Sequence, residues 1–384
     1  MNYYIIAGEA SGDLHGSNLI KELRKLDAGA DMRCWGGDKM EAAGAILVKH
    51  YRDLAFMGFI EVLRNLRTIF RNLDFCKKDI LEYNPDALIL IDYPGFNLRI
   101  AKWAKQQKIR VIYYISPQVW AWKESRVKMM KQCIDKMLVI LPFEKEFYEQ
   151  KWNWQVEYVG HPLVKVIDEF VPMPIDKTYD SVDREQHTTE SRQPGAGIIA
   201  LLPGSRKQEI LKKLPVMLEV SRSFPAYQFI VAKAPGVNEN FYNELLLPYH
   251  NVSFVSNRTY DLLAQSTAAL VTSGTATLET ALFNVPEVIC YKGSNISYQI
   301  AKRLISIKYI CLVNLIMNKE VVKELIQDNF NVSNVTRELH ELLENPAKQK
   351  QLEQDYQALK ALLSKGGNAS ANAAISIFEW MNTK

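Results

Sequence analysis

Residues 198–209 read Ile198-Ile-Ala-Leu-Leu-Pro-Gly-Ser-Arg206-Lys-Gln-Glu209. The apolar residues predict a buried strand, Pro203 and Gly204 end it, and Ser205 can cap the helix that follows. A strand that turns through glycine into a helix leaves unpaired backbone N–H groups at the positive end of the helix dipole, and Arg206 adds a full charge there. The turn therefore predicts an anion site, most often for a phosphate. The same residues also fit an ordinary β–α turn that carries a solvated arginine.

A second turn of this kind follows in Val271-Thr-Ser273-Gly274-Thr275-Ala276-Thr277-Leu278-Glu279. Two such turns in one domain could clamp a diphosphate from both sides. Glu279 shares a helix face with Thr275 and Ala276, where its carboxylate could accept both hydroxyl groups of a ribose. Lys292 adds a further cation after the next strand. The pattern predicts binding of a nucleoside diphosphate, and the absence of Gly-x-x-x-x-Gly-Lys-Ser/Thr argues against ATP hydrolysis.

The composition indicates a folded protein of about two domains, with 384 residues, of which 48% are hydrophobic and 23% are charged. A net charge of +4 argues against a broad nucleic-acid interface. The five cysteines contain no Cys-x-x-Cys pair and predict neither a zinc site nor a disulfide framework. The N-terminus lacks the basic region of a signal peptide, and no apolar run is long enough to span a membrane. We expect a cytoplasmic protein that can still touch a membrane surface.

The N-terminal strand Tyr3–Ala7 leads into a glycine-containing loop over residues 8–16, and we expect a helix from about Ser17 to Leu26. The glycine spacing is not Gly-x-Gly-x-x-Gly, which argues against a dinucleotide. The loop carries two carboxylates and a hydroxyl, which suit the hydroxyl groups of a sugar better than a phosphate; these residues are Glu9, Asp13 and Ser11. Alternatively, Asp13 or Ser11 caps the helix.

Asp92 follows the continuously apolar run Ala87–Ile91, which predicts a strand covered on both faces. A carboxylate at the carboxyl end of a central parallel strand lies where open α/β sheets bind their ligands. Such a group, held rigidly and facing a crevice, can act as a general base. Asn97 lies in the same loop. The alternative is a helix cap or a turn residue.

Strand and helix patterns alternate through both halves of the chain and predict parallel sheets with helices on both faces. Residues 171–197 are rich in Asp, Thr, Ser, Glu and Pro and predict a polar linker. In the second half we expect strands at Ile198–Leu202, Tyr227–Ala232, Val252–Val255, Ala268–Thr272 and Glu287–Tyr291. The predicted organisation is a Rossmann-like domain over 1–170, the linker 171–197, a second such domain over 198–355, and C-terminal helices over 356–384 that could pack back on the first domain.

Residues 54–75 combine apolar residues at helical spacing with arginines three and four positions apart. An apolar stripe flanked by arginines is typical of a helix that lies in a lipid interface, although a core-facing helix with a solvated basic face fits the same pattern. The candidate membrane residues are Phe56, Met57, Phe59, Arg64, Arg67 and Arg71.

The two α/β domains, the polar linker and the diphosphate clamp resemble a GT-B glycosyltransferase, whose two Rossmann-like parallel-sheet domains face each other across a cleft. Particular strings resemble the lipid-A-disaccharide synthase family and follow its order along most of the chain. They are Ala7-Gly-Glu-Ala-Ser-Gly-Asp13, Ile91-Asp92-Tyr-Pro-Gly-Phe-Asn97, Ser116-Pro-Gln-Val-Trp-Ala-Trp122, Leu141-Pro-Phe-Glu-Lys145, Gly160-His161-Pro162, Leu201-Leu-Pro-Gly-Ser-Arg206, and Ser273-Gly-Thr-Ala276 with Glu279.

The resemblance implies an inverting transfer that joins UDP-2,3-diacylglucosamine to 2,3-diacylglucosamine 1-phosphate and releases a β-1,6 disaccharide and UDP, without a bound metal or cofactor. It implies that Asp92 is the base for the acceptor 6-hydroxyl and that Glu9 assists the acceptor. Arg206, Ser273 to Thr275, Glu279 and Asn314 fall where the family holds UDP. The turns and the neighbouring cation add Gly204, Ser205, Ala276 and Lys292 to the predicted site. Gly95 departs from the family pattern, in which a second Asp often stands, and this leaves Asp92 as the only carboxylate of its loop.

Acyl chains and phosphates in these substrates favour a lipid-facing role for residues 54–71 at the inner face of the inner membrane. The resemblance also implies a homodimer with exchanged C-terminal segments, in which Asn314 acts on the partner's nucleotide. Two other readings fit the residues: a UDP-sugar epimerase of similar architecture, and a non-catalytic, nucleotide-regulated membrane-binding module.

Overall fold

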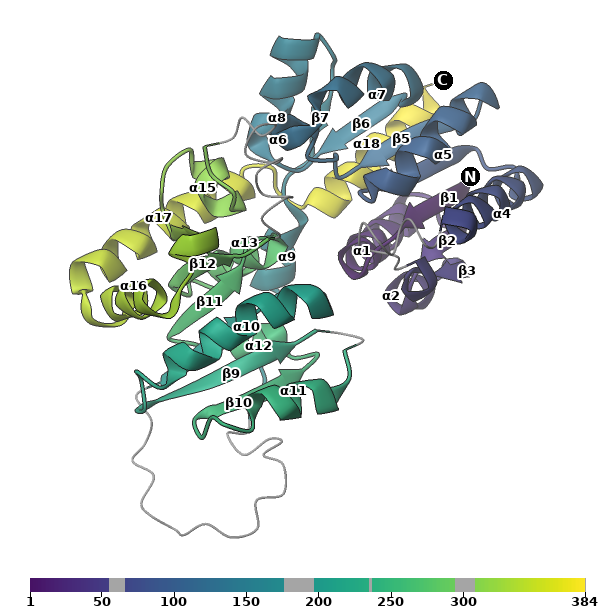
Figure 1. Cartoon of the computed structure of the whole chain (residues 1–384). Helices are drawn as coiled ribbons and strands as arrows, with labels where there is room; N and C mark the ends of the chain where they lie inside the picture. The colour runs from purple at the N-terminus through teal and green to yellow at the C-terminus, as the bar shows by residue number, and fades with distance from the viewer. Residues whose placement is uncertain (55–65, 176–196, 235–236, 294–307, 384) are drawn as a thin grey trace. The chain divides into compact units, whose positions relative to one another are not determined.

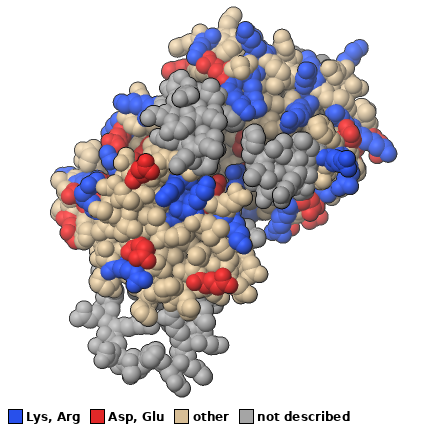
Figure 2. Space-filling model, in the orientation of Figure 1, with Lys and Arg blue, Asp and Glu red and all other residues tan. Residues whose placement is uncertain are grey.

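The computed structural model describes residues 1–54, 66–175, 197–234, 237–293 and 308–383 (Figure 1). The chain forms two compact units. Unit 1 comprises Met1–Lys165 and Leu363–Lys384, and unit 2 comprises Val166–Leu362. Lys and Arg side chains are interspersed with Asp and Glu on the visible face of both units (Figure 2), in keeping with the small net charge.

Unit 1 contains a seven-stranded parallel sheet in the order β3-β2-β1-β4-β5-β6-β7. Its strands are β1 (Asn2–Ala7), β2 (Asp31–Gly36), β3 (Ile46–His50), β4 (Ala87–Ile91), β5 (Arg110–Tyr114), β6 (Lys136–Val139) and β7 (Glu157–Tyr158). Its helices are α1 (Ala10–Leu26), α2 (Asp38–Ala42), α4 (Leu66–Tyr83), α5 (Pro94–Gln106), α6 (Val119–Trp122), α7 (Val127–Cys133), α8 (Pro142–Glu146) and α18 (Ala369–Asn382), and α9 (Pro162–Asp168) continues into unit 2.

Helices cover both faces of this sheet, so the central strand β4 is apolar at every position. All five residues of β4 are fully buried; Leu88 and Leu90 face one core, and Ile89 and Ile91 face the other. The second core includes α18, which packs beside α1 (Figure 1). The end of the chain thus returns to unit 1, with the boundary at Leu363, where the sequence analysis placed it at residue 356.

Unit 2 contains a six-stranded parallel sheet in the order β10-β9-β8-β11-β12-β13. Its strands are β8 (Gly197–Leu202), β9 (Tyr227–Lys233), β10 (Val252–Ser256), β11 (Ala268–Thr272), β12 (Glu287–Tyr291) and β13 (Lys323–Ile326). Its helices are α10 (Lys207–Ser221), α11 (Glu239–Leu246), α12 (Thr259–Ala264), α13 (Thr275–Leu282), α15 (Leu312–Met317), α16 (Val332–Glu344) and most of α17 (Pro346–Ser364).

The five strands predicted in the second half are confirmed to within one residue at each end, whereas β2, β3 and β13 were missed. The loop predicted over residues 8–16 is wrong, because α1 begins at Ala10. Its glycines serve close packing: a Cβ at Gly16 would lie 2.6 Å from the sulfur of Met40. The start of the predicted linker is also part of unit 2. The backbone N–H of Met173 donates to Asp261 at 2.7 Å, and the side chain of Ile175 is buried.

Both sheets reverse their strand order at one point. In unit 1, β1 lies between β2 and β4, and in unit 2, β8 lies between β9 and β11. Connections leave β1 and β4, or β8 and β11, toward opposite faces, and this opens a crevice at the carboxyl ends of the two strands. Each unit therefore has one preferred ligand position, and it can be named from the residues that follow these strands.

Candidate functional site

In unit 1 the residues at this position are Glu9, just after β1, and Asp92, just after β4. The Asp92 side chain is partly exposed, so it is not sealed within the sheet. Burial of most of the carboxyl, together with the neighbouring charge of Glu9, raises the pKa of Asp92 to about 7. A carboxyl group that titrates near neutral pH is suited to taking a proton from a hydroxyl group.

The backbone at Asp92 is strained, and the surrounding residues hold it. Asp92 and Tyr93 have φ values of 44° and 47°, in the left-handed region that few residues other than glycine adopt. The carbonyl oxygen of Asp92 accepts hydrogen bonds from the hydroxyl of Tyr113 at 2.5 Å and from Nδ2 of Asn97 at 2.8 Å. Asn97 is fully buried and also donates to the Ile91 carbonyl at 3.2 Å. The amide nitrogen of Asn97 therefore positions the backbone at Asp92, while its buried Oδ1 accepts no hydrogen bond from the described residues.

Gly8 leaves space for the ring of Tyr93, the residue next to Asp92. A Cβ atom at Gly8 would lie 2.3 Å from ring carbons of Tyr93, so any larger residue there must displace the ring. Glycine at this position is required by the contact between the β1–α1 turn and the β4–α5 turn. The turn after β1 and the turn after β4 therefore pack directly against each other.

The carboxylate of Asp13 stabilises the start of a neighbouring helix. Its buried carboxylate accepts backbone N–H groups of Gly37 at 2.8 Å, Met40 at 3.0 Å and Lys39 at 3.2 Å, and so caps the start of α2. The alternative prediction, that Asp13 caps the helix that contains it, is wrong: no side chain caps α1, and the helix that Asp13 caps is α2. Since these donors occupy the carboxylate, we leave Asp13 out of the groups proposed to bind substrate. Ser11 is exposed in the first turn of α1.

Glu144 is a site residue that the sequence analysis did not single out. It is 1% exposed, follows β6 at the same edge of the sheet, and accepts hydrogen bonds from Nε1 of Trp120 at 3.2 Å and from the backbone N–H of Leu141 at 3.0 Å. Burial is the main cause that raises its pKa to about 7, and the charge of Asp92 adds to the rise. Glu144 lies within the string Leu141-Pro-Phe-Glu-Lys145, and this family resemblance was the sequence feature that could have identified it.

Two histidines lie buried in unit 1, and both are held neutral. Burial lowers the pKa of His15 to about 4, with a contribution from Lys39, and lowers that of His161 to about 3, with a contribution from His15. At neutral pH both imidazoles are therefore uncharged, and neither can act as a protonated acid. We therefore assign neither of them the role of the general acid.

In unit 2 the first ligand position is the turn between β8 and α10. Gly204 has φ of +117°, and a Cβ there would lie 2.8 Å from Oε2 of Glu209, so both conformation and space require glycine. Ser205 and Arg206 are exposed, and Arg206 forms an ion pair with Glu209 at 3.5 Å. The predicted cap by Ser205 is wrong, because the residue preceding the helix is Arg206 and no side chain caps it.

Lys213 adds a buried cation beneath this turn, and the sequence analysis missed it. Its side chain is 3% exposed, and its Nζ lies 3.7 Å from the position of a Cβ on Gly204. Burial lowers the pKa of Lys213, and the carboxylate of Glu209 opposes that effect. A partly desolvated ammonium group behind the backbone turn strengthens an anion site. In the sequence, Lys213 is hidden in a pair of adjacent lysines.

The second turn, between β11 and α13, is held in place by a hydrogen-bond network. The hydroxyl of Ser273 donates to the Ile310 carbonyl at 2.9 Å, and the N–H of Ile310 donates to Oε2 of Glu324 at 3.0 Å. Asn314 donates to Oε1 of Glu324 at 3.0 Å, and its Oδ1 accepts the N–H groups of Val321 and Val322. Asn314 is fully buried and uses its hydrogen-bonding capacity within this chain. In this chain Asn314 therefore positions the turn, and its contact with a nucleotide stays a prediction.

The other predicted groups of unit 2 are accessible. Gly274 and Thr275 are exposed, Ala276 is partly exposed, and a Cβ on Gly274 would meet open space. Glu279 accepts a hydrogen bond from the hydroxyl of Tyr260 at 2.9 Å, and burial raises its pKa. Lys292 is exposed after β12. These groups follow β8, β11 and β12, three adjacent strands, and so gather at one edge of the sheet.

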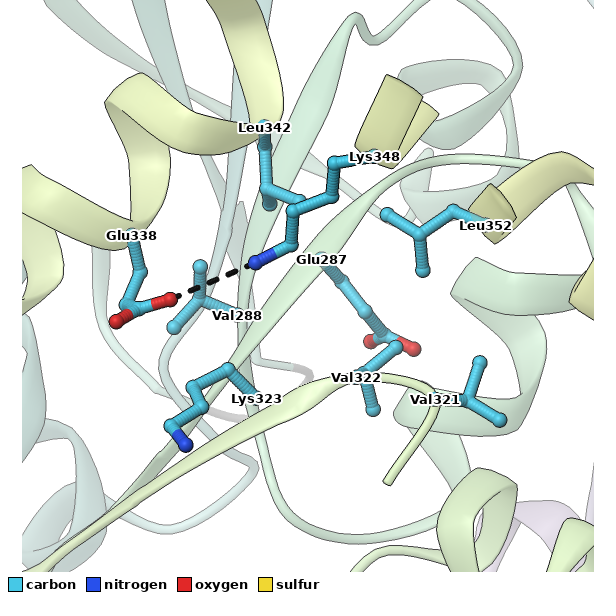
Figure 3. Close-up of a pocket in the computed structure, with 9 residues that line it drawn as sticks. All are labelled: Glu287, Val288, Val321, Val322, Lys323, Glu338, Leu342, Lys348 and Leu352. Carbon is cyan, nitrogen blue, oxygen red and sulfur yellow. Dashed lines mark ion pairs between the residues drawn. The ribbon is translucent and has the colours of Figure 1, made fainter. Parts of the chain in front are cut away.

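A pocket elsewhere in unit 2 is too small for any substrate. It lies between β12, β13, α16 and α17, and its volume of about 10 Å³ is room for one water molecule (Figure 3). Glu287 points into it from the start of β12, the edge of the sheet opposite the two turns. Glu287 is 1% exposed, neither of its carboxyl oxygens has a hydrogen-bond partner among the described residues, and burial raises its pKa well above the ordinary value.

Of the candidate membrane residues, Phe56, Met57, Phe59 and Arg64 lie outside the described residues. The described part of the segment begins with α4, which buries Leu73 in the core and exposes 59% of Phe70. Arg67 and Arg71 are exposed on either side of it along the helix. No helix within the described ranges is long and apolar enough to cross a membrane. Among those same residues, no group of three His, Cys, Asp or Glu side chains could hold a metal ion.

A family model described as lipid-A-disaccharide synthetase matches residues 3–378. The lipid-A-disaccharide synthase of Geobacter sulfurreducens is 37% identical over 377 residues, which cover 97% of this chain and 95% of that protein. That of Syntrophus aciditrophicus is 38% identical over 380 residues, covering 97% and 96%. Among solved structures, a UDP-GlcNAc 2-epimerase from Neisseria meningitidis aligns over 100% of both chains with a TM-score of 0.64 and 13% identity. The glycosyltransferase of kitacinnamycin aligns over 99% and 98% with a TM-score of 0.63 and 14% identity.

Proposed function

This chain belongs to the lipid-A-disaccharide synthetase family, which makes it a glycosyltransferase of lipid A biosynthesis, and we propose the reaction that it catalyses. It joins UDP-2,3-diacylglucosamine to 2,3-diacylglucosamine 1-phosphate, and it releases the β-1,6-linked disaccharide 1-phosphate and UDP. The observation that carries the proposal is that the carboxyl of Asp92, with its raised pKa, follows β4 at the switch point of one sheet, and that two glycine-containing turns follow β8 and β11 at the switch point of the other.

Asp92 is the general base. Its carboxylate takes the proton of the acceptor 6-hydroxyl, and the oxygen attacks C1 of the donor sugar from the face opposite UDP. The bond from C1 to the oxygen of the UDP β-phosphate breaks with inversion at C1. Asn97 and Tyr113 keep the backbone of Asp92 in its left-handed conformation, so the carboxylate needs no rearrangement before it acts. Glu9 tunes the base and contacts the acceptor, with Ser11 beside it.

Unit 2 holds UDP. The turn at Gly204 to Arg206, backed by the buried Lys213, and the turn at Ser273 to Ala276 donate to the diphosphate and stabilise the charge that develops as UDP leaves. Glu279 accepts from the ribose hydroxyl groups, while Tyr260 fixes its carboxylate. Lys292 adds positive charge at the same edge.

Peripheral membrane contact through α4 and the segment before it delivers the acylated substrates. The exposed Phe70 between Arg67 and Arg71 supports this role, since apolar and basic groups together favour an anionic lipid interface. Changing both arginines to glutamate should abolish sedimentation with phosphatidylglycerol vesicles. Changing Lys102 and Lys108, which are exposed on unit 1 outside α4, should not. Equal sedimentation of both variants would remove α4 from this role.

The decisive experiment supplies the purified protein with both lipid substrates and follows the products by thin-layer chromatography. We expect a disaccharide and UDP, formed only when both substrates are present, and a loss of at least about a hundredfold in turnover for Asp92→Asn with UDP affinity retained. A changed hexosamine formed from the UDP-sugar alone would indicate an epimerase. Vesicle and UDP binding without any product would indicate a binding module.

A further inference from the structure

A carboxylate of the protein itself lies at the turn between β8 and α10. Glu209 belongs to the first turn of α10, and its Oε1 lies 3.5 Å from Nη1 of Arg206. Its Oε2 lies 2.8 Å from the position that a Cβ on Gly204 would take, and its own Cβ lies 3.3 Å from that position. The two oxygens of Glu209 therefore reach two of the groups that the proposed function assigns to the phosphates of UDP.

Lys213 approaches the same point from beneath the turn. Its Nζ lies 3.7 Å from the same Cβ position on Gly204, and the residue is only 3% exposed. Among the described residues, none accepts a hydrogen bond from this ammonium group, and Glu209 is the carboxylate that acts on its charge. The thiol of Cys290, which also lies near it, stays protonated because burial raises its pKa. The Glu209 carboxylate is therefore the counter-charge of a buried cation as well as of an exposed one.

The carboxylate and the groups around it differ in their freedom to move. Lys213 is buried and Gly204 contributes backbone, so both keep their places when a ligand arrives. The Glu209 side chain is 35% exposed and can rotate into solvent. A phosphate repels a carboxylate that shares its donors, and a diphosphate brings more charge and more acceptor oxygens than one carboxylate. A phosphate that enters the turn must therefore displace Glu209.

We propose that Glu209 is an internal counter-ion that takes the place of a UDP phosphate before UDP binds, and that binding exchanges its carboxylate for the phosphate at Arg206 and Lys213. The inference rests on the proposed function for the identity of the nucleotide. Before UDP binds, the carboxylate offsets the cost of a buried ammonium group. When UDP is bound, the carboxylate competes with the phosphate, which weakens UDP binding and favours the release of UDP after the transfer.

The test measures the affinity of the whole protein for UDP and for uridine by calorimetry or ligand-observed NMR. We expect Glu209→Gln to lower the Kd for UDP about three- to tenfold, because the amide keeps the shape of the side chain without its charge. The Kd for uridine, which carries no phosphate, should stay unchanged. Glu219→Gln is the matched control and should change neither value, since Glu219 lies on the same helix and also pairs with an arginine three residues away, Arg222 at 3.1 Å.

A second variant tests the buried cation. Lys213→Met removes the charge from a side chain of similar length, and it should raise the Kd for UDP about tenfold while that for uridine stays unchanged. Thermal unfolding of the variant checks that it is folded. An equal loss of affinity for both ligands in the folded variant would remove Lys213 from the phosphate site and overturn the exchange as proposed.

The Glu209 variant decides between the remaining outcomes. A Kd for UDP that Glu209→Gln leaves unchanged or raises would overturn the proposal, and so would an equal gain in affinity for uridine. Tighter UDP binding by this variant, in a protein that forms no disaccharide, would support the counter-ion and refute the proposed reaction. Disaccharide synthesis together with a Kd for UDP that does not respond to Glu209→Gln would refute the counter-ion alone.

Discussion

The pH dependence of turnover should report the ionisation of Asp92. Its carboxyl titrates at a pKa of about 7 because burial and the charge of Glu9 both disfavour the ionised form. The raised pKa means that the proton stays on the carboxyl at acidic pH, and the base becomes active only as the pH rises through 7. An ordinary aspartate would be ionised at every pH at which the enzyme is folded, and the rate would then be flat.

The magnitude follows from the fraction ionised. With a pKa of about 7, roughly one tenth of Asp92 is ionised at pH 6 and roughly nine tenths at pH 8, so kcat/KM should rise about tenfold between them. Glu9→Gln removes the negative charge that repels the ionised Asp92. The pKa of Asp92 should fall, and the rise of kcat/KM should move to lower pH. Burial is the larger cause, so the pKa stays above its ordinary value. If the pKa of Asp92 falls by half to one unit, the rate at pH 6 should rise about three- to fivefold relative to the plateau.

The assay is initial-rate disaccharide synthesis from pH 5.5 to 8.5, with each variant normalised to its own plateau. Glu22→Gln is the matched control, because Glu22 is also a carboxylate on the α1 side but pairs with Lys25 at 2.8 Å and Lys165 at 3.6 Å. Glu144→Gln tests a second carboxyl group whose pKa is about 7, and the rise of kcat/KM between pH 6 and pH 8 should remain in this variant. A flat profile in the unmodified enzyme, or identical shifts in the Glu9 and Glu22 variants, would refute the assignment.

Three other changes test separate parts of the structure. Gly8→Ala should displace the Tyr93 ring beside the base and cost about 1–3 kcal/mol of stability and at least about tenfold in turnover, measured by thermal unfolding and by rates; unchanged values would show that the ring moves freely. Arg206→Ala should raise the Kd for UDP about tenfold in calorimetry, while Arg222→Ala at the far end of the same helix should leave it unaltered; equal effects would count against the clamp. Glu287→Gln should be more stable than the unmodified protein at pH 8 and similar at pH 4.5. Because the pKa of Glu287 is raised in the folded state, the free energy of unfolding falls by about 1.4 kcal/mol for each pH unit between the pKa in the unfolded state and the pKa in the folded state. A difference in melting temperature that does not change with pH would contradict this.

Much of the architecture could be predicted from local patterns. A parallel strand covered on both faces must be apolar at every position, so Ala87–Ile91 and Ile198–Leu202 are visible in the sequence, and the residues that follow them are known at once. The turn at Gly204 and the position of Asp92 at a strand end follow from the same reasoning. The strands β2 and β3 were missed because neither is a continuous apolar run: β2 carries the charged residues Asp31 and Arg33 in its first half, and β3 has no fully buried residue.

The sequence by itself determined where the ligand-facing turns lie, because a strand end and a glycine are local features. Only the tertiary structure decided what each polar side chain contacts. Asp13 caps a helix that begins 25 residues later, Asn97 reaches the carbonyl of a residue 91 positions earlier, and Asn314 bonds to residues at the start of β13. A carboxylate or an amide carries the same letter whether its partner is a substrate or a distant backbone group. Its pKa and its availability depend on burial and on neighbours that folding brings together, as they do at Asp92 and Lys213.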